Sequence, residues 1–189
     1  MTSNPRGSAA VPSAADQAGP GRPDTASAEG AVTELYEAHA LGMIRLAYIM
    51  LGDRSSAEDV VQEAFCGLYR RWPYLCDPGS GVYYVRSSVL NGCRSVLRRD
   101  NAHASRATTG YQPSADSAES AVLTGEERRE VMRALRRLPQ RQREALVLRF
   151  YLDLSAEETA TTMGINPGSV RSAIHRGLAS LGRILQESS

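Results

Sequence analysis

The feature that most constrains this chain is a set of helix-start signals that recurs in two separate stretches, residues 31–100 and 123–187. Three starts carry Ser or Thr followed three residues later by Glu, which is the pattern of an N-terminal capping box. A fourth start is an Asn cap followed by Pro, the residue favoured at the first helical position. No alternation of apolar and polar residues persists in either stretch, so we expect an all-α fold. The four starts are Ser55 with Glu58, Thr124 with Glu127, Ser155 with Glu158, and Asn166 with Pro167.

The two helical stretches are separated by a segment of different composition. Residues 101–122 are rich in Ala, Ser, Thr, Gly and Asp and contain Pro113, as is typical of a flexible linker. Residues 1–30 offer few large apolar side chains to offset the entropy of ordering, so we expect a disordered N-terminal tail. The sequence therefore predicts two small helical domains, 31–100 and 123–187, joined by a flexible linker.

Composition narrows the classes of function. The 189 residues are 42% hydrophobic and contain no run of 18 apolar residues, so we expect no membrane insertion. The absence of a signal-peptide pattern and the odd number of cysteines, three, favour the reducing environment of the cytoplasm. There is no phosphate-binding loop, nucleophile motif or pair of metal ligands. We therefore expect no enzyme, no catalytic residue, no metal site and no cofactor.

The most specific local signal is a helix-turn-helix pattern between Leu154 and Leu185. A short helix over Ser155–Met163, a turn containing Gly164 and a longer helix from Pro167 make up this pattern. Apolar residues at helical spacing predict a buried stripe along the longer helix. The stripe consists of Val170, Ile174, Leu178, Leu181 and Leu185.

The other side of this longer helix carries short polar side chains and Arg. Such a surface fits the major groove of DNA, where Arg binds guanine through two hydrogen bonds; the alternative is an ordinary solvated face. The predicted duplex-binding residues are Ser169, Arg171, Ser172, His175 and Arg176. Further Arg residues upstream would supply contacts to phosphates, and Arg149 is predicted to make one. Acidic residues among them, including Glu144, are expected to pair with Arg four residues away.

Two helices of the first domain carry candidate binding faces. On the helix after Ala57, a polar side with two carboxylates indicates either a docking surface for a protein partner or a solvated face. That side consists of Asp59, Gln62 and Glu63. On the helix from Gly81 to Arg99, a line of aromatic, amide and Arg side chains suits single-stranded nucleic acid, with a half-buried tyrosine as the alternative. The line consists of Tyr84, Ser87, Asn91, Arg94 and Arg98. Gly92 lies inside this helix at a cost of about 1 kcal/mol relative to Ala, and no sequence pattern accounts for it.

Two sets of motifs occur in order, one in each helical stretch. The first stretch contains Ala57–Phe65 (AEDVVQEAF) and Tyr69–Trp72 (YRRW). The second contains Leu154–Ala160 (LSAEETA), Gly168–Ser172 (GSVRS) and His175–Leu178 (HRGL). With these motifs the chain resembles the extracytoplasmic-function (group 4) sigma factors of bacterial RNA polymerase, members of the sigma-70 family, and in particular their sigma-E-like actinobacterial branch.

The resemblance implies a function for each part of the chain. Residues 31–100 are similar to sigma region 2, whose acidic helix around Asp59, Gln62 and Glu63 would dock on core RNA polymerase at its beta and beta-prime subunits. The loop Cys76–Gly81 and the helix after it would hold the melted −10 strand. Residues 123–187 are similar to region 4, whose helix-turn-helix would read the −35 duplex. An anti-sigma factor is a further candidate partner.

Other classes of function stay open at this point. A helix-turn-helix regulator could bind duplex DNA without polymerase. A redox or zinc sensor could use the three cysteines and one histidine, although no two of these cysteines have the close spacing of a metal site. The residues of such a sensor would be Cys66, Cys76, Cys93 and His103.

Overall fold

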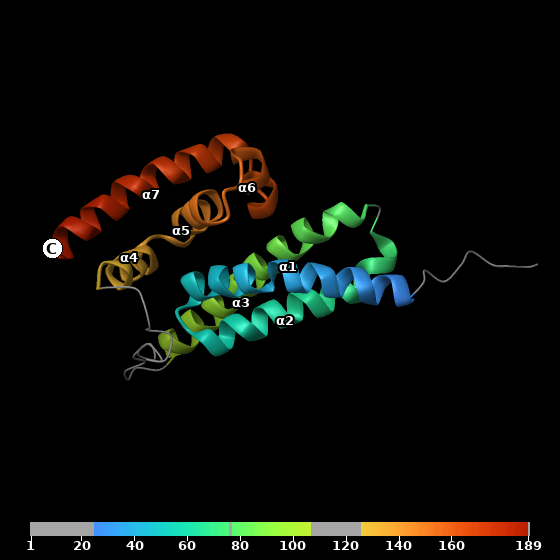
Figure 1. Cartoon of the computed structure of the whole chain (residues 1–189). Coiled ribbons are helices and arrows are strands. Elements are labelled where there is room, and N and C mark those ends of the chain that lie inside the picture. Colours follow the sequence, from blue (N-terminus) through green and yellow to red (C-terminus); the bar gives the residue numbers. More distant parts are fainter. Residues whose placement is uncertain (1–24, 76, 107–125, 189) are drawn as a thin grey trace, which may run out of the picture.

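The computed structural model describes residues 25–75, 77–106 and 126–188, and helices make up most of this part of the chain (Figure 1). No strand occurs among the described residues, so the prediction of an all-α fold is confirmed. Short helical turns join the longer helices at Trp72–Tyr74 (η1) and Pro78–Ser80 (η2), and a π-helical turn spans Val147–Tyr151 (η4). The α-helices are α1 (Thr25–Leu51), α2 (Arg54–Arg71), α3 (Gly81–Arg106), α4 (Glu126–Arg137), α5 (Gln140–Leu146), α6 (Ala156–Met163) and α7 (Pro167–Ser188).

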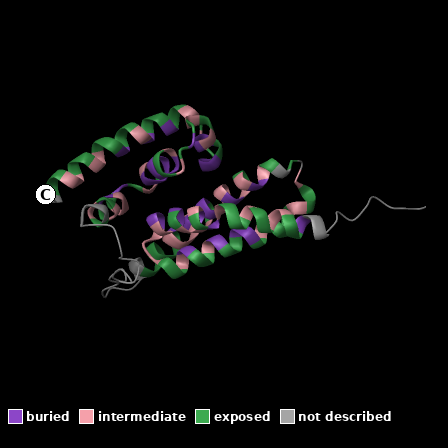
Figure 2. Cartoon of the chain, viewed as in Figure 1, coloured by how far each residue is buried: buried purple, intermediate pink, exposed green. Residues whose placement is uncertain are grey.

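Helices α1, α2 and α3 form the first unit, a three-helix bundle. Each packs on the other two through side chains at helical spacing, and Figure 2 shows buried residues where the three face one another. The ring of Tyr36 meets that of Phe65 edge to face, with centroids 5.0 Å apart. The largest fully buried side chains of this bundle are Leu46, Met50, Val61, Leu68, Val89, Leu90 and Cys93.

Gly92 of α3 faces Val60 of α2. A Cβ atom at this position would lie 2.7 Å from Cγ1 of Val60, a separation that carbon atoms do not adopt, so either the Val60 side chain or one of the two helices would have to shift. The glycine that the sequence left unexplained therefore allows the two helices to pack closely, and this packing offsets its low helix propensity.

Helices α4 to α7 form the second unit, and α6 and α7 are the predicted helix-turn-helix. Ser155 and Glu158 form the predicted capping box, with the Glu158 N–H donating to the Ser155 hydroxyl at 3.1 Å and the Ser155 N–H donating to the Glu158 carboxylate at 2.8 Å. The hydrogen bond from the Ser155 N–H lowers the pKa of the Glu158 carboxyl group. Gly164 ends α6 with a left-handed backbone (φ +70°), which favours glycine. Asn166 caps α7 by accepting a hydrogen bond from the Ser169 N–H at 2.8 Å.

One predicted helix start is wrong. Ser55 and Glu58 do not form a capping box, because Asp53 is the N-cap of α2 and its carboxylate accepts a hydrogen bond from the Ser56 N–H at 2.7 Å. This bond holds the pKa of Asp53 below its usual range. Glu58 instead pairs with Arg54 at 2.8 Å. The predicted start at Thr124 lies outside the described residues.

Two helices extend beyond the boundaries predicted for the domains. Helix α1 begins at Thr25, within the stretch predicted as a tail, and Ala28 is buried. Helix α3 continues to Arg106, into the stretch predicted as linker. Both extensions are rich in Ala, the residue with the highest helix propensity. The rest of the predicted tail and linker lies outside the described residues.

The predicted apolar stripe of α7 is partly wrong. Val170 is fully buried, but Leu178 is 47% exposed. The buried side includes Ala173 instead, and at Gly177 a Cβ atom would lie 3.1 Å from the Leu146 side chain of α5. The small residues Ala173 and Gly177 let α5 approach α7 on that side, and this approach turns Leu178 toward solvent.

The capping box at Ser155 gives a test of the helix-turn-helix. Replacing Ser155 with Ala should lower the free energy of unfolding by about 1 kcal/mol, because the Glu158 N–H loses its acceptor. Chemical denaturation followed by circular dichroism measures this loss. Thr161→Ala is the matched control: its hydroxyl, on the exposed side of the same helix, donates to the Glu157 carbonyl. An equal loss in both variants would contradict the capping role.

Candidate polymerase and nucleic-acid interfaces

The acidic face of α2 is open to solvent. Asp59, Gln62 and Glu63 are all exposed, as predicted, and their helix is held to the bundle by Val61 and Phe65 on its buried side. The Arg70 guanidinium, two helical turns further along, donates a hydrogen bond of 2.6 Å to the Glu63 carboxylate and forms an ion pair with it. Both side chains of this pair are mostly exposed, so the pair costs little to break. The face presents acceptors that a basic partner surface can bind.

The N-terminal half of α7 presents the predicted duplex-binding residues together. Four of the five are exposed and line one shallow hollow on the surface, and Ser169 is exposed beside them. Arg171 lies 3.9 Å from Glu157 of α6, and both side chains are about two-thirds exposed, so this ion pair is weak. The positive end of the α7 dipole lies at the same place and favours a phosphate group. The four residues of the hollow are Arg171, Ser172, His175 and Arg176.

Arg149 lies at the entrance to the helix-turn-helix. One of its terminal nitrogens donates to the Leu154 carbonyl at 2.9 Å and lies 3.4 Å from the Asp153 carboxylate. Asp153 itself has a positive φ of 51°. Arg149 thus braces the turn that leads into α6, a role the sequence did not predict, and contact with a phosphate stays a prediction.

The predicted line of residues on α3 is only partly open. Tyr84 is half-buried and packs against Gly67 of α2, where a Cβ atom would lie 3.0 Å from its hydroxyl. Ser87 is half-buried, whereas Asn91 is exposed. Arg98 is exposed and donates to the Ser95 hydroxyl at 3.0 Å. In the loop before α3, the Gly79 N–H donates to the Asp77 carboxylate at 3.0 Å; Cys76 lies outside the described residues.

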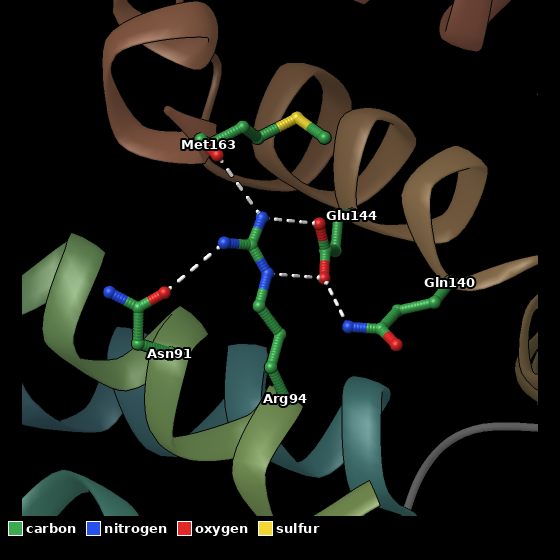
Figure 3. A network of polar contacts seen from close by, with 5 residues as sticks. All are labelled: Asn91, Arg94, Gln140, Glu144 and Met163. Atoms are coloured by element: carbon green, nitrogen blue, oxygen red, sulfur yellow. Dashed lines mark hydrogen bonds and ion pairs between the residues drawn. The ribbon is translucent and has the colours of Figure 1, made fainter. Parts of the chain in front are cut away.

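The Arg94 side chain contacts residues of the second unit and so joins the two units (Figure 3). Its guanidinium forms a two-point pair with the Glu144 carboxylate of α5, at 2.9 Å and 2.7 Å. It also donates to the Met163 carbonyl at the end of α6, at 3.3 Å, and to the Asn91 side chain at 3.1 Å. Gln140 donates to the same carboxylate at 2.8 Å. The hydrogen bonds to Glu144 raise the pKa of Arg94.

Two of the charged residues upstream of the helix-turn-helix are buried, contrary to the sequence prediction. The Glu144 side chain has no exposed surface, and it pairs with Arg94 instead of an Arg four residues away. Arg143 is 7% exposed, so its guanidinium is not accessible to a phosphate. Burial also lowers the pKa of this guanidinium. The signal that could have located Glu144 is its place directly before the apolar run Ala145–Leu148.

The cysteines do not support the sensor alternative. Cys93 is fully buried in the first bundle, and burial raises the pKa of its thiol to about 12. Cys66 is exposed on α2. Across residues 25–75, 77–106 and 126–188, His, Cys, Asp and Glu never gather in groups of three or more that could hold a metal ion. None of the described helices is long and apolar enough to span a membrane.

Comparisons with known proteins agree with this arrangement of two helical units. Residues 35–103 match the family Sigma-70 region 2, and residues 128–181 match the family Sigma-70, region 4. The chain is 30% identical over 144 residues to an RNA polymerase sigma-E factor of Streptomyces avermitilis, covering 76% of this chain and 79% of that protein. It is 32% identical over 165 residues to the RNA polymerase sigma factor CarQ of Myxococcus xanthus, covering 85% and 92%.

A solved structure shares the fold at lower identity. The chain aligns with the sigma factor RpoE of Bartonella quintana, solved in complex with the anti-sigma factor NepR, with a TM-score of 0.66 and 19% identity, over 82% of this chain and 98% of that one. The two helical units define a transcription initiation factor of the sigma-70 type. The chain belongs to the extracytoplasmic-function sigma factors of RNA polymerase.

Membership of this family decides between the classes of function. A sigma factor binds core RNA polymerase and promoter DNA and directs initiation, so the chain is an initiation factor and not an enzyme. A regulator that binds duplex DNA without polymerase is not favoured.

Proposed function

We propose that three faces of this sigma factor have separate binding roles in transcription initiation. The face of α2 with Asp59, Gln62 and Glu63 docks on the beta and beta-prime subunits of core RNA polymerase. The N-terminal half of α7 reads the −35 duplex. The exposed side of α3, with the loop before it, holds the melted −10 strand.

The observation that carries this proposal is the surface of α7. Its five predicted duplex-binding residues are exposed together, at the end of the helix that a helix-turn-helix directs into the major groove. Arg171 and Arg176 supply donors for guanine, while Ser169 and Ser172 supply short polar groups that let the backbone approach. A solvated face needs no such combination of small residues and donors, so the surface supports DNA binding.

Two further assignments rest on the same reasoning. The cytoplasm is the proposed location, since core polymerase and promoter DNA are there. An anti-sigma factor is a proposed partner, supported by the Bartonella quintana structure, in which RpoE is in complex with the anti-sigma factor NepR.

Transcription with purified core RNA polymerase tests the proposed function. We expect the full chain to direct transcripts from discrete start sites on genomic templates, with two shared sequence elements upstream, near −10 and −35. Mapping the transcript ends measures this result. Binding of duplex DNA without polymerase, together with no transcript from core plus this chain, would contradict the proposal.

A further inference from the structure

Arg70 and Glu63 form an ion pair with an unusual spacing on the exposed side of α2. The two residues are seven positions apart, about 20° short of two full turns, so they lie on the same side of the helix. Ion pairs within a helix usually join residues three or four positions apart, and those positions after Glu63 are Cys66 and Gly67. The Arg70 side chain therefore extends back along the helix beside Gly67, and it donates to the Glu63 carboxylate at 2.6 Å.

The same glycine borders the proposed −10 face. A Cβ atom at Gly67 would lie 3.0 Å from the Tyr84 hydroxyl of α3 and 3.9 Å from Nη2 of Arg70. The guanidinium and the hydroxyl are thus close to the same point on the surface of α2. Tyr84 is the first residue of the line on α3 that suits single-stranded nucleic acid. Arg70 therefore lies where α2 meets the beginning of this line.

The line on α3 has no cation of its own at this end. Its two Arg residues, Arg94 and Arg98, follow Tyr84 by ten or more positions, which is about 15 Å or more along the helix. A single strand that stacks a base on an aromatic ring brings its backbone phosphates near that ring, where a positive groove usually follows them. A guanidinium suits this place, because its donors can bind two phosphate oxygens at once. Arg70 can supply this group from the neighbouring helix.

The present partner of Arg70 belongs to the proposed docking face. Glu63 is one of the three α2 residues proposed to bind core polymerase, and its side chain is 75% exposed while that of Arg70 is 64% exposed. An ion pair with this much exposure contributes little to stability. A docking surface that excludes water and brings its own cations offers the Glu63 carboxylate stronger partners than Arg70 does. Docking would therefore release the Arg70 guanidinium at the edge of the −10 face.

We propose that Arg70 is a phosphate-binding residue of the −10 face, and that it pairs with Glu63 until Glu63 docks on core polymerase. The released guanidinium then binds a backbone phosphate of the melted strand beside Tyr84. The proposal rests on the proposed functions of α2 and α3. It links these two faces through one side chain, so that core binding at Glu63 increases the affinity for the strand without moving a helix.

Binding of the holoenzyme to a single-stranded oligonucleotide with the mapped −10 sequence tests the phosphate contact. Arg70→Ala should lower the affinity roughly tenfold, the size expected for a lost hydrogen bond between charged groups. It should also lower the slope of log affinity against log salt concentration by about 0.7, the value for one phosphate of a single strand. Arg70→Lys keeps the charge and should keep the slope.

Neutral methylphosphonates, placed at one phosphate of the oligonucleotide at a time, locate the contact. At one position the replacement should weaken binding by the unchanged protein but not by Arg70→Ala, because that variant has already lost the contact. Unchanged affinity and slope in Arg70→Ala would overturn the phosphate contact, and so would equal sensitivity of the two proteins at every position.

A second ion pair of α2 provides a matched control. Arg54 lies 2.8 Å from Glu58, and its side chain is 64% exposed, as is that of Arg70, but this pair lies at the opposite end of the helix. Arg54→Ala should change neither the affinity for the strand nor the slope. Circular dichroism should show equal helix content in all variants.

The full chain without polymerase tests the exchange of partners. Glu63→Gln frees Arg70, so we expect roughly two- to fivefold tighter binding of the same oligonucleotide, the range set by an exposed ion pair. Glu58→Gln removes the same charge from the control pair and should leave binding unchanged. Adding Arg70→Ala to Glu63→Gln should abolish the gain, and a gain that persists without Arg70 would overturn the exchange.

Binding to core polymerase gives a result of opposite sign. Arg70→Ala should bind core polymerase at least as tightly as the unchanged protein, because Glu63 no longer has a competing partner. A loss of core affinity in this variant would place Arg70 in the docking surface and overturn the proposal.

Asn91→Ala separates this proposal from the proposed function of α3. Asn91 is exposed on α3 itself, within the same line as Tyr84. Loss of strand affinity in the Asn91→Ala holoenzyme but not in Arg70→Ala would overturn the role of Arg70 and support the −10 face. Loss in neither variant would overturn both assignments. Loss in Arg70→Ala alone would support the phosphate contact and overturn the assignment of the α3 line.

Discussion

Reversing the charge of Asp59 and Glu63 to Arg should abolish binding to core RNA polymerase and leave the helix content unchanged. Both side chains are exposed on α2, so the fold does not depend on them. Loss of one member of an interfacial charge pair costs roughly 2–5 kcal/mol, and reversal adds repulsion. Two such losses amount to about 4 kcal/mol or more, or roughly a thousandfold in affinity. Fluorescence anisotropy with labelled protein and purified core polymerase measures the change.

The control for this experiment is a second pair of reversals on α1, Glu34→Arg with Glu37→Arg. These two side chains are exposed, and the change in net charge is the same. The control should bind core polymerase nearly as the unchanged protein does, since its charges lie on another helix. Wild-type affinity in the α2 variant, or an equal loss in both variants, would refute docking through the acidic face of α2.

Local signals in the sequence were sufficient for most helix boundaries. The capping box at Ser155 was predictable because all its atoms lie within four residues, and the same holds for the Asn166 cap. The prediction at Ser55 failed because two residues there can cap the helix. Asp53 is the N-cap, since its carboxylate accepts the hydrogen bond from the Ser56 N–H. Which of the two residues caps the helix depends on the residue at which the helix begins. The spacing of residue types alone does not determine that residue.

The rotation of α7 depended on its neighbours. Periodicity alone placed Leu178 in the core, because it gives weight to large apolar side chains. In the structure the small residues Ala173 and Gly177 lie on the buried side, since α5 packs closely there. The five candidate duplex-binding residues are still exposed, because they point away from the face of the helix that buries Val170.

The pairing of Arg94 with Glu144 was beyond sequence reasoning for a different reason. The two residues are 50 positions apart, on units separated by a segment of low complexity. Each has candidate partners nearby, so the spacing offered no reason to join them. The candidate −10 face could be predicted as a line on a helix, but the contacts of Arg94 with α5 and α6 follow only from the packing of the two units.

Replacing Arg171 or Arg176 with Ala should relax sequence preference at one position of the −35 element. Both are exposed on the half of α7 that a helix-turn-helix places against bases, and the weak pair of Arg171 with Glu157 is no obstacle. A lost two-point contact with guanine costs about 1–3 kcal/mol at that base pair alone. A lost phosphate contact weakens all sequences alike and lowers the salt dependence of binding. We expect the first result for Arg171 or Arg176 and the second for Arg149.

Holoenzyme binding to a panel of single-base −35 variants at two salt concentrations separates these cases. Arg183→Ala is the matched control: it removes the same charge from the exposed side of α7, in the half directed away from the bases. It should leave the preference unchanged. Arg149→Ala needs a check of unfolding as well, because its bond to the Leu154 carbonyl braces the entrance to α6. If neither Arg171 nor Arg176 alters the preference at any base, then α7 does not enter the groove through this face, because no other exposed Arg lies on its N-terminal half.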